Sequence, residues 1–365
     1  KAVHTSIVFS LLGGIVVAVL GELAAAALLR TLHVPDDVFP QALLYLRIYL
    51  MGMPVILLYN FEAAIFRSVG ETRVPLVALA MSGVLNVLLN LFFVAVLHMT
   101  VNGVAIATVM ANAFSSALLF RRLLRSGKDI RLEPRRLRMD GRSLWMILRI
   151  GLPAGLQSAV FAISNIVIQS AINSLGADAM AGSVAAFTIE INIYSFINAF
   201  GLAATTFVSQ NYGAKNLERC KRATYVATGL NMVATVLMVA LVLVFGRTML
   251  GLFTDVPAVV ELAMARIFWV ASFEPISVLM EVSSSAMRGY GYSMPPAMAT
   301  LICVCSVRLI WVWTVFAASP DYVTLMIVYP ISWAVTVVPL LYLYVRLMKR
   351  IKRRFEERAL EAEAA

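Results

Sequence analysis

Long apolar segments alternate with short polar connections along almost the whole chain. Each segment has about 20 residues or more, the length that a helix needs to cross the hydrocarbon core of a bilayer. None shows the alternation of apolar and polar residues typical of a membrane β-barrel, so we expect helices. The ten predicted spans are Ile7–Leu29, Gln41–Phe66, Leu76–Leu97, Gly103–Phe120, Ile150–Leu175, Ser183–Val208, Tyr225–Phe245, Leu262–Met287, Ala297–Ala317 and Leu325–Leu347.

Two of these segments carry the same landmark residues at a constant separation. The matched pairs, 221 residues apart, are Pro54 with Pro275, Arg67 with Arg288, Gly70 with Gly291 and Pro75 with Pro296. Four landmarks in register predict an internal repeat. The matched prolines lie six spans apart, an even number, so both copies are predicted to run in the same direction. Such copies are related by a pseudo-two-fold axis along the membrane normal, an arrangement found in transporters.

The two copies are not equally represented in the chain. The second contains six predicted helices, but the first contains only four, and the repeat aligns Lys1 with Arg222 at the entry to the seventh span. We therefore expect a twelve-helix parent protein whose first two helices are missing from this sequence. The predicted organisation is a partial N-lobe (1–126), a linker (127–146), a six-helix C-lobe (147–350) and a tail (351–365).

Basic residues gather in alternate connections between the spans. One set of loops and ends carries 25 Lys and Arg residues, and the other carries only Arg30 and Arg247. Cytoplasmic loops are enriched in basic residues, so this asymmetry predicts both ends of the parent protein in the cytoplasm. It also explains the net charge of +10 as a topology signal, and we expect no nucleic-acid partner.

Composition narrows the class of protein further. The chain is 61% hydrophobic and 14% charged, whereas a soluble domain is roughly half apolar and about a quarter charged. A phosphate-binding G-x-x-x-x-G-K-[ST] motif is absent from the sequence, which excludes an ATP motor of that type within it. We identify no catalytic residues, no metal site and no cofactor.

Charged residues inside the predicted spans are the best candidates for function, because charge in a membrane is costly. Glu274 and Arg308 lie at equal sequence distance from the turn at Gly291, so they are predicted at similar depth and could form an ion pair. Glu281 is seven residues after Glu274 and shares its helix face. Glu190, Glu274, Glu281 and Glu62 are the candidates for ion coupling, since buried carboxyl groups can bind protons.

Polar stripes indicate a wet interior or hydrogen bonds between helices. Ser158, Asn165, Gln169 and Asn173 share one face of the fifth span, and Asn86 and Asn90 share a face of the third. Pro54 and Pro275 each remove a backbone hydrogen bond in the middle of a span. We therefore treat these two prolines as candidate hinges.

Three short motifs resemble a known family. Gly151-Leu152-Pro153 opens the fifth span. The stretch Thr206-Phe-Val-Ser-Gln-Asn-Tyr-Gly-Ala214 closes the sixth, and Met287-Arg-Gly-Tyr-Gly291 closes the eighth. Together they resemble the multidrug and toxic compound extrusion (MATE) family, bacterial branch. The resemblance implies an all-α polytopic fold with two pseudo-symmetric six-helix lobes and a central cleft that opens to alternate sides.

The resemblance also implies export of cationic or amphipathic small molecules driven by inward flow of H⁺ or Na⁺. The acids of the sodium-coupled branch would fall near Phe161 and Ser277, where this chain has none, so the coupling ion stays open. The candidates for the substrate cavity are Gln157, Ser158, Asn165, Gln169, Asn86, Asn90, Arg308, Gln210 and Asn211.

The sequence thus predicts a secondary active multidrug antiporter, not an enzyme. We expect it to be a monomer in the bacterial cytoplasmic (inner) membrane, with the lipid bilayer and small-molecule substrates as its partners. Two alternatives stay open. A flippase for a lipid-linked saccharide would need a more basic cleft, in which Arg308 is the one mid-membrane arginine that the sequence places. A non-transporting receptor or membrane enzyme would need polar residues clustered at one membrane face.

Overall fold

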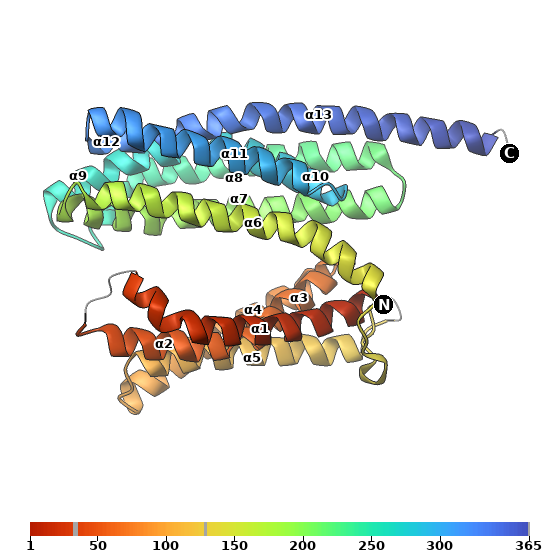
Figure 1. The fold of residues 1–365 in the computed structure, drawn as a ribbon, viewed down its shortest axis with the longest axis horizontal. Coiled ribbons are helices and arrows are strands. Elements are labelled where there is room, and N and C mark those ends of the chain that lie inside the picture. Colours follow the sequence, from red (N-terminus) through yellow and green to blue (C-terminus); the bar gives the residue numbers. More distant parts are fainter. Residues whose placement is uncertain (32–35, 128–129, 364–365) are drawn as a thin grey trace. The chain divides into compact units, whose positions relative to one another are not determined.

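A computed structural model describes residues 1–31, 36–127 and 130–363, with side chains up to residue 357. The described part of the chain is helical and divides into two compact units, Lys1–Leu148 and Arg149–Ala365 (Figure 1). This agrees with the predicted all-α fold.

The first unit is built from five α-helices and two short irregular turns within the described ranges. They are α1 (Ala2–Thr31), α2 (Phe39–Met51), α3 (Met53–Ser68), α4 (Arg73–Leu91), the π-helix η1 (Phe92–Val96), α5 (Val101–Leu124) and the 3₁₀ turn η2 (Pro134–Arg136).

The second unit contains the longer helices. They are α6 (Gly141–Asn173, which begins before the boundary), α7 (Ala177–Gly213), α8 (Leu217–Leu250), α9 (Pro257–Arg266), the π-helix η3 (Ile267–Ala271), α10 (Glu274–Gly289), α11 (Met294–Trp311), the π-helix η4 (Val312–Phe316), α12 (Tyr322–Met326) and α13 (Val328–Glu363).

The lengths and compositions of the helices agree with the ten predicted spans. Within the described residues, eight helices are long and apolar enough to cross a membrane, and two bent helix pairs bring the number to ten. Large apolar side chains lie on the outside of the bundles, with Leu23 79%, Val244 73% and Trp313 73% exposed. Serine, threonine and charged residues are instead buried inside, as expected where the surroundings of the helices are themselves apolar.

The two copies of the repeat share local irregularities as well as residues. Helices α2 and α3 meet at 47° just before Pro54, and the pair formed by α9–η3 and α10 meets at 43° just before Pro275. Gly70 and Gly291 have φ values of 80° and 82°, in the left-handed region that favours glycine. The π-helices η1 and η4 also occupy corresponding places. The two copies of the repeat therefore share helix bends and turns as well as matching residues.

The predicted linker packs against the first unit over part of its length. Leu132 is 1% exposed, the backbone N–H of Glu133 donates to His4 Nε2 (3.2 Å), and that of Asp140 donates to Thr5 Oγ1 (3.0 Å). Asp140 also accepts hydrogen bonds from the Ser143 hydroxyl and backbone N–H at the start of α6. These two bonds, followed by the charge of Lys1, lower the pKa of the Asp140 carboxyl group. At the other end, the predicted tail continues α13 as far as Glu363.

Glycine allows two helices of the first unit to touch. A Cβ atom at Gly14 would overlap the backbone of Pro54, so α1 can meet the α2–α3 bend only without a side chain there, whereas a Cβ at Gly13 would have no neighbour within 4 Å.

We expect Gly14→Ala to lower the stability of the protein by about 1–3 kcal/mol, because the added methyl group must push the helices apart. Gly13→Ala is the matched control, and it should be neutral or stabilising because alanine favours helix more than glycine does. The measurement is the apparent melting temperature of purified protein in detergent. Equal melting temperatures for the two variants would contradict the close contact.

Candidate functional site

A charged cavity lies inside the second unit. Its volume is about 890 Å³, and its walls come from α6, α7, the α9–η3–α10 segment, α11 and α13. Aromatic side chains such as Phe161, Tyr194 and Trp333 form part of the lining. The charged residues of the lining are Glu190, Arg266, Glu274, Glu281, Arg288 and Arg308. Three acidic and three basic groups thus meet in one cavity, and their pairing decides which of them can bind an ion or a substrate.

Glu190 and Arg266 form a buried, two-pronged ion pair. Arg266 Nε lies 3.0 Å from Glu190 Oε1 and Nη2 lies 2.9 Å from Oε2, while the two side chains are 5% and 7% exposed. The planar guanidinium matches both carboxylate oxygens at once. The charge of Glu190 is therefore already balanced within the protein, and protonating this carboxylate would leave Arg266 unpaired.

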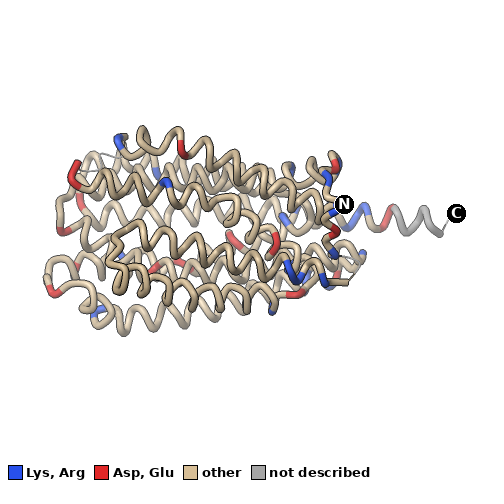
Figure 2. Tube along the Cα trace, turned by 90° about the horizontal axis from the view of Figure 1, so that it is seen from below, with Lys and Arg blue, Asp and Glu red and all other residues tan. Residues whose placement is uncertain are grey.

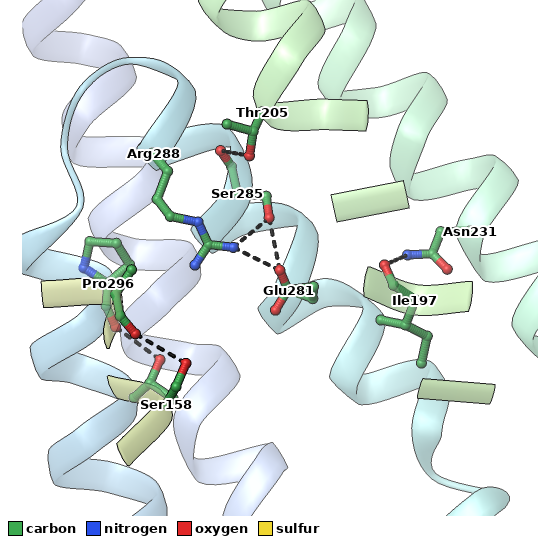
Figure 3. A network of polar contacts seen from close by, with 10 residues as sticks. Ser158, Ile197, Thr205, Asn231, Glu281, Ser285, Arg288 and Pro296 are labelled. Atoms are coloured by element: carbon green, nitrogen blue, oxygen red, sulfur yellow. Dashed lines mark hydrogen bonds and ion pairs between the residues drawn. The ribbon is translucent and has the colours of Figure 1, made fainter. Parts of the chain in front are cut away.

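Glu281 belongs to a hydrogen-bonded network in the second half of α10, two turns after Glu274 (Figure 3). Its Oε1 accepts from Arg288 Nη2 (2.7 Å) and from the Ser285 hydroxyl (2.8 Å), and Arg288 Nη2 also donates to Ser285 Oγ (2.7 Å). Gly201 on α7 leaves room for this network, because a Cβ there would lie 2.8 Å from Glu281 Oε1. Glu281 thus has a cationic partner of its own.

Glu274 differs from the other two acids. It is 5% exposed and lies in the first turn of α10, directly after the bend. Its carboxylate accepts a hydrogen bond from the Ser277 hydroxyl. Among the described residues, no Lys, Arg or His nitrogen lies within 4.0 Å of it, in contrast to Glu190 and Glu281. Glu274 is therefore the acid of this cavity whose protonation would break no ion pair.

Arg308 is held by neutral groups. Its Nη1 donates to Asn165 Oδ1 (2.8 Å), and its guanidinium lies 4.6 Å from the centre of the Tyr329 ring and 6.0 Å from that of Phe161. The Nε atom is buried and has no hydrogen-bond partner in the described part of the chain. Arg308 is consequently a buried cation without a direct carboxylate partner.

The predicted ion pair between Glu274 and Arg308 is wrong as a direct contact. Both residues line the cavity, so similar depth was a sound expectation. Their closest polar partners are nevertheless Ser277 and Asn165. The position of a residue along its helix determines its depth but not the direction in which its side chain points. Glu274 and Arg308 lie at similar depth, but groups on their own or neighbouring helices are closer and become their hydrogen-bond partners.

Sequence reasoning also missed Arg266. The sequence places it near a helix end, yet it is 4% exposed and pairs with Glu190. Arg308 is therefore not the only buried arginine in the lining of the charged cavity. A buried acid in the sixth span needed a partner, and this requirement was the signal that could have pointed to Arg266.

Three members of the polar face predicted on α6 line the cavity, namely Ser158, Asn165 and Gln169, and the candidate Gln157 lines it as well. The fourth member of the face, Asn173, is not part of the lining. Gln169 Nε2 also donates to Asn173 Oδ1 (2.9 Å), and the Ser158 hydroxyl donates to the Ala154 carbonyl (3.1 Å). The structure thus brings the α6 residues together with Glu190, Glu274, Glu281 and Arg308.

The remaining predicted residues do not line this cavity. Asn211 is near the end of α7, where its side chain donates to the Phe207 carbonyl (2.8 Å), and Gln210 precedes it. Asn90 Nδ2 donates to Asn86 Oδ1 (3.0 Å) on α4, in the other unit. Glu62, also in that unit, is fully buried, and one of its oxygens accepts from the Ser116 hydroxyl (2.8 Å).

Comparison with known proteins now identifies the family. The MatE family model matches residues 1–92 and 153–314, more than half of the chain. The chain belongs to the MatE family. This match confirms the family resemblance that the three sequence motifs indicated. MatE proteins are multi-pass membrane transporters and not enzymes, which excludes the alternative that the chain is a membrane enzyme.

Individual relatives agree with this assignment. "Probable multidrug resistance protein YoeA" of Bacillus subtilis is 25% identical over 318 residues, covering 84% of this chain and 68% of the relative. "FAD transporter" of Shewanella oneidensis is 24% identical over 350 residues, covering 91% and 74%. The chain spans 63 to 68% of the length of three multidrug resistance relatives.

The fold is shared with solved transporters. The structure described as "Outward-facing conformation of a multidrug resistance MATE family transporter of the MOP superfamily" superposes with a TM-score of 0.87 at 20% identity, covering 96% of this chain and 79% of that one. At this level of identity, the likeness establishes the MatE fold and leaves the chemistry of the cavity to be argued from its own residues.

The buried ion pair yields a prediction about stability. Glu190→Gln should destabilise the MatE protein by roughly 3–5 kcal/mol, because it leaves the Arg266 charge buried without a partner. The double variant Glu190→Leu with Arg266→Met should recover most of that loss. The control is Glu261→Gln, which removes the partner of Arg247 in a pair whose side chains are 63% and 62% exposed and should change little. Thermal unfolding in detergent checks all three, and an equal effect of Glu190→Gln and Glu261→Gln would refute the special role of burial.

Proposed function

We propose that this protein is a secondary active antiporter that exports cationic or amphipathic small molecules, driven by inward flow of H⁺ or Na⁺. The observation that carries the proposal is the state of Glu274, a buried cavity acid with no Lys, Arg or His in direct contact among the described residues. A coupling acid must be free to exchange its ion for a substrate, and Glu190 and Glu281 are each already engaged with an arginine.

Competition for one negative charge would couple the two flows. A cationic substrate is attracted by ionised Glu274, and a proton or Na⁺ that reaches this carboxylate removes the attraction. By thermodynamic linkage, the ion then weakens substrate binding by the same factor by which the substrate weakens ion binding. Ion binding from outside would therefore release the substrate there.

The aromatic lining suits the apolar body of such a substrate. Cations bind favourably over aromatic faces, and Phe161, Tyr194 and Trp333 are available in the cavity. The bends before Pro54 and Pro275, of 47° and 43°, are the places at which we propose that the helices flex during alternating access. Glu62 is kept as a second acid for ion coupling because it is buried without a charged partner among the described residues.

An anionic substrate is the competing proposal. One relative is named a FAD transporter, and Arg308 lacks a carboxylate partner. A flippase for a lipid-linked saccharide would use the same positive charge. The cavity nevertheless balances three arginines with three acids, and two of those arginines are paired. A cation that exchanges with a proton or Na⁺ therefore fits the charge distribution better than a polyanion.

For the whole transporter, we propose a monomer in the bacterial inner membrane with both ends in the cytoplasm. The support is the accumulation of basic residues in alternate connections, which sets orientation in the bilayer.

Transport by reconstituted protein tests the coupling. A fluorescent cation should accumulate in vesicles when a pH or Na⁺ gradient is imposed, and Glu274→Gln should abolish the gradient dependence because it removes the exchangeable charge. Glu261→Gln, outside the cavity, is the matched control and should transport like the unaltered protein. Accumulation that ignores both gradients, or that keeps its gradient dependence in Glu274→Gln, would overturn the proposal.

Binding measurements test the sign of the coupling separately. At a fixed Na⁺ concentration, acidification should weaken binding of a cationic amphiphile to the purified protein, and Glu274→Gln should make its Kd independent of pH over the same range. A neutral amphiphile of the same shape serves as the control, because it does not compete with protons for charge. Tighter binding of the cation at low pH would contradict the proposed competition for the charge of Glu274.

A further inference from the structure

A second hollow of the same unit lies outside the charged cavity and has a different chemistry. It measures about 920 Å³ and lies between α13 and the turn that joins α10 to α11. We refer to it as the α13 groove. The basic residues that line it are Arg346, Lys349, Arg350, Arg353 and Arg354, with Glu357 as the one acid in the lining.

The basic residues form a stripe along one side of α13. Arg346, Arg350 and Arg353 follow one another at steps of four and three, so they share a helix face. At a rise of about 1.5 Å per residue, they cover about 10 Å along the helix axis, enough to span the headgroup layer at one side of a bilayer, which is roughly 5–8 Å thick. Figure 2 shows Lys and Arg positions along the part of the chain that leads to the C-terminus.

The positive charges of the stripe have no direct carboxylate partners in the described part of the chain. Among the described residues, none of Arg346, Lys349, Arg350 and Arg353 has a carboxylate within 4.0 Å, whereas nearby Lys352 pairs with Glu356 on another side of the helix. Arg354 Nη1 lies 3.2 Å from the hydroxyl group of Tyr292, which ties α13 to the α10–α11 turn. The groove therefore has a fixed wall and an excess of unpaired cations.

The inner end of the groove is apolar. Leu343 and Leu347 lie on α13 just before and within the stripe, and Met287 contributes from α10. Met287 and Leu347 are 1% and 8% exposed, so they form a packed floor. A ligand that fits this surface carries a phosphate at one end and a hydrocarbon chain at the other.

We propose that the α13 groove binds an anionic phospholipid, with its phosphate among Arg346, Arg350 and Arg353 and an acyl chain against Leu343 and Leu347. Basic pockets at the ends of membrane helices are suited to such headgroups. The lipid would hold α13 to the α10–α11 turn, so that α10, which carries Glu274, is supported from its far end. This inference does not depend on the coupling ion or the substrate of the charged cavity.

Lipid titration followed by native mass spectrometry tests the proposal. Purified protein in neutral detergent is mixed with phosphatidylglycerol or with phosphatidylcholine of the same acyl chains, and bound lipids are counted. We expect one retained phosphatidylglycerol, bound at least about tenfold more tightly than phosphatidylcholine. The triple variant Arg346→Gln, Arg350→Gln, Arg353→Gln should lose this preference.

The control has the same change in charge at another helix end. Arg121, Arg122 and Arg125 at the end of α5 are exposed and lie in the other unit, and their triple replacement by glutamine should keep the retained lipid. Equal loss in both triple variants would show diffuse attraction instead of a site, and no loss in either would also overturn the proposal. Glycerol phosphate is the third arm: if it displaces the lipid at matched concentration, the groove is a site for free phosphate and the lipid proposal is wrong.

Discussion

Charge and backbone polarity are costly inside a bilayer unless polar partners surround them, and this constraint organises the protein. Hydrocarbon offers no hydrogen bonds, so each spanning segment must satisfy its backbone internally as a helix. The same rule governs side chains. Glu190 forms an ion pair with Arg266, and Glu62 accepts a hydrogen bond from the Ser116 hydroxyl. Arg308 donates a hydrogen bond to Asn165 and lies over the Tyr329 ring. Bulky apolar residues such as Leu23 are left for the outer surface.

Departures from regular helix occur where they position the site. The bend before Pro275 interrupts the helix at the depth of the cavity, and Glu274 follows in the next turn. Proline has no backbone N–H to donate to the preceding turn of the helix. The position of Pro275 in the sequence therefore favours a bend at this point. The other copy of the repeat bends at Pro54 but carries Met53 in place of an acid. Both copies of the repeat therefore contain the proline bend, but only the second copy carries an acid, Glu274, beside it.

The pairing of the cavity charges separates structural groups from groups that can respond to ions. Protonation of an acid that is held by an arginine is costly, because it leaves the arginine charge buried without a partner. Glu274 has no such partner and faces the same space as the polar side of α6. In the α13 groove the balance of charge is reversed. Its basic residues outnumber Glu357, the one acid of the lining, and none of its arginines has a described carboxylate within 4.0 Å, which favours an anionic ligand. One unit thus offers two places of different charge, separated along α10.

The sequence by itself determined the membrane-spanning helices, their number and the repeat, because hydrophobic length and matched Gly and Pro residues are local properties of the chain. It also identified Glu190, Glu274, Glu281 and the α6 face, since polar residues in apolar spans stand out without any structure. Only the tertiary structure decided which charges pair. Arg266 reaches Glu190 from 76 residues away, and Arg308 turns to Asn165 rather than to Glu274. Which charged side chains pair depends on how the packed helices are rotated and tilted against one another. The spacing of residues along one segment does not determine this.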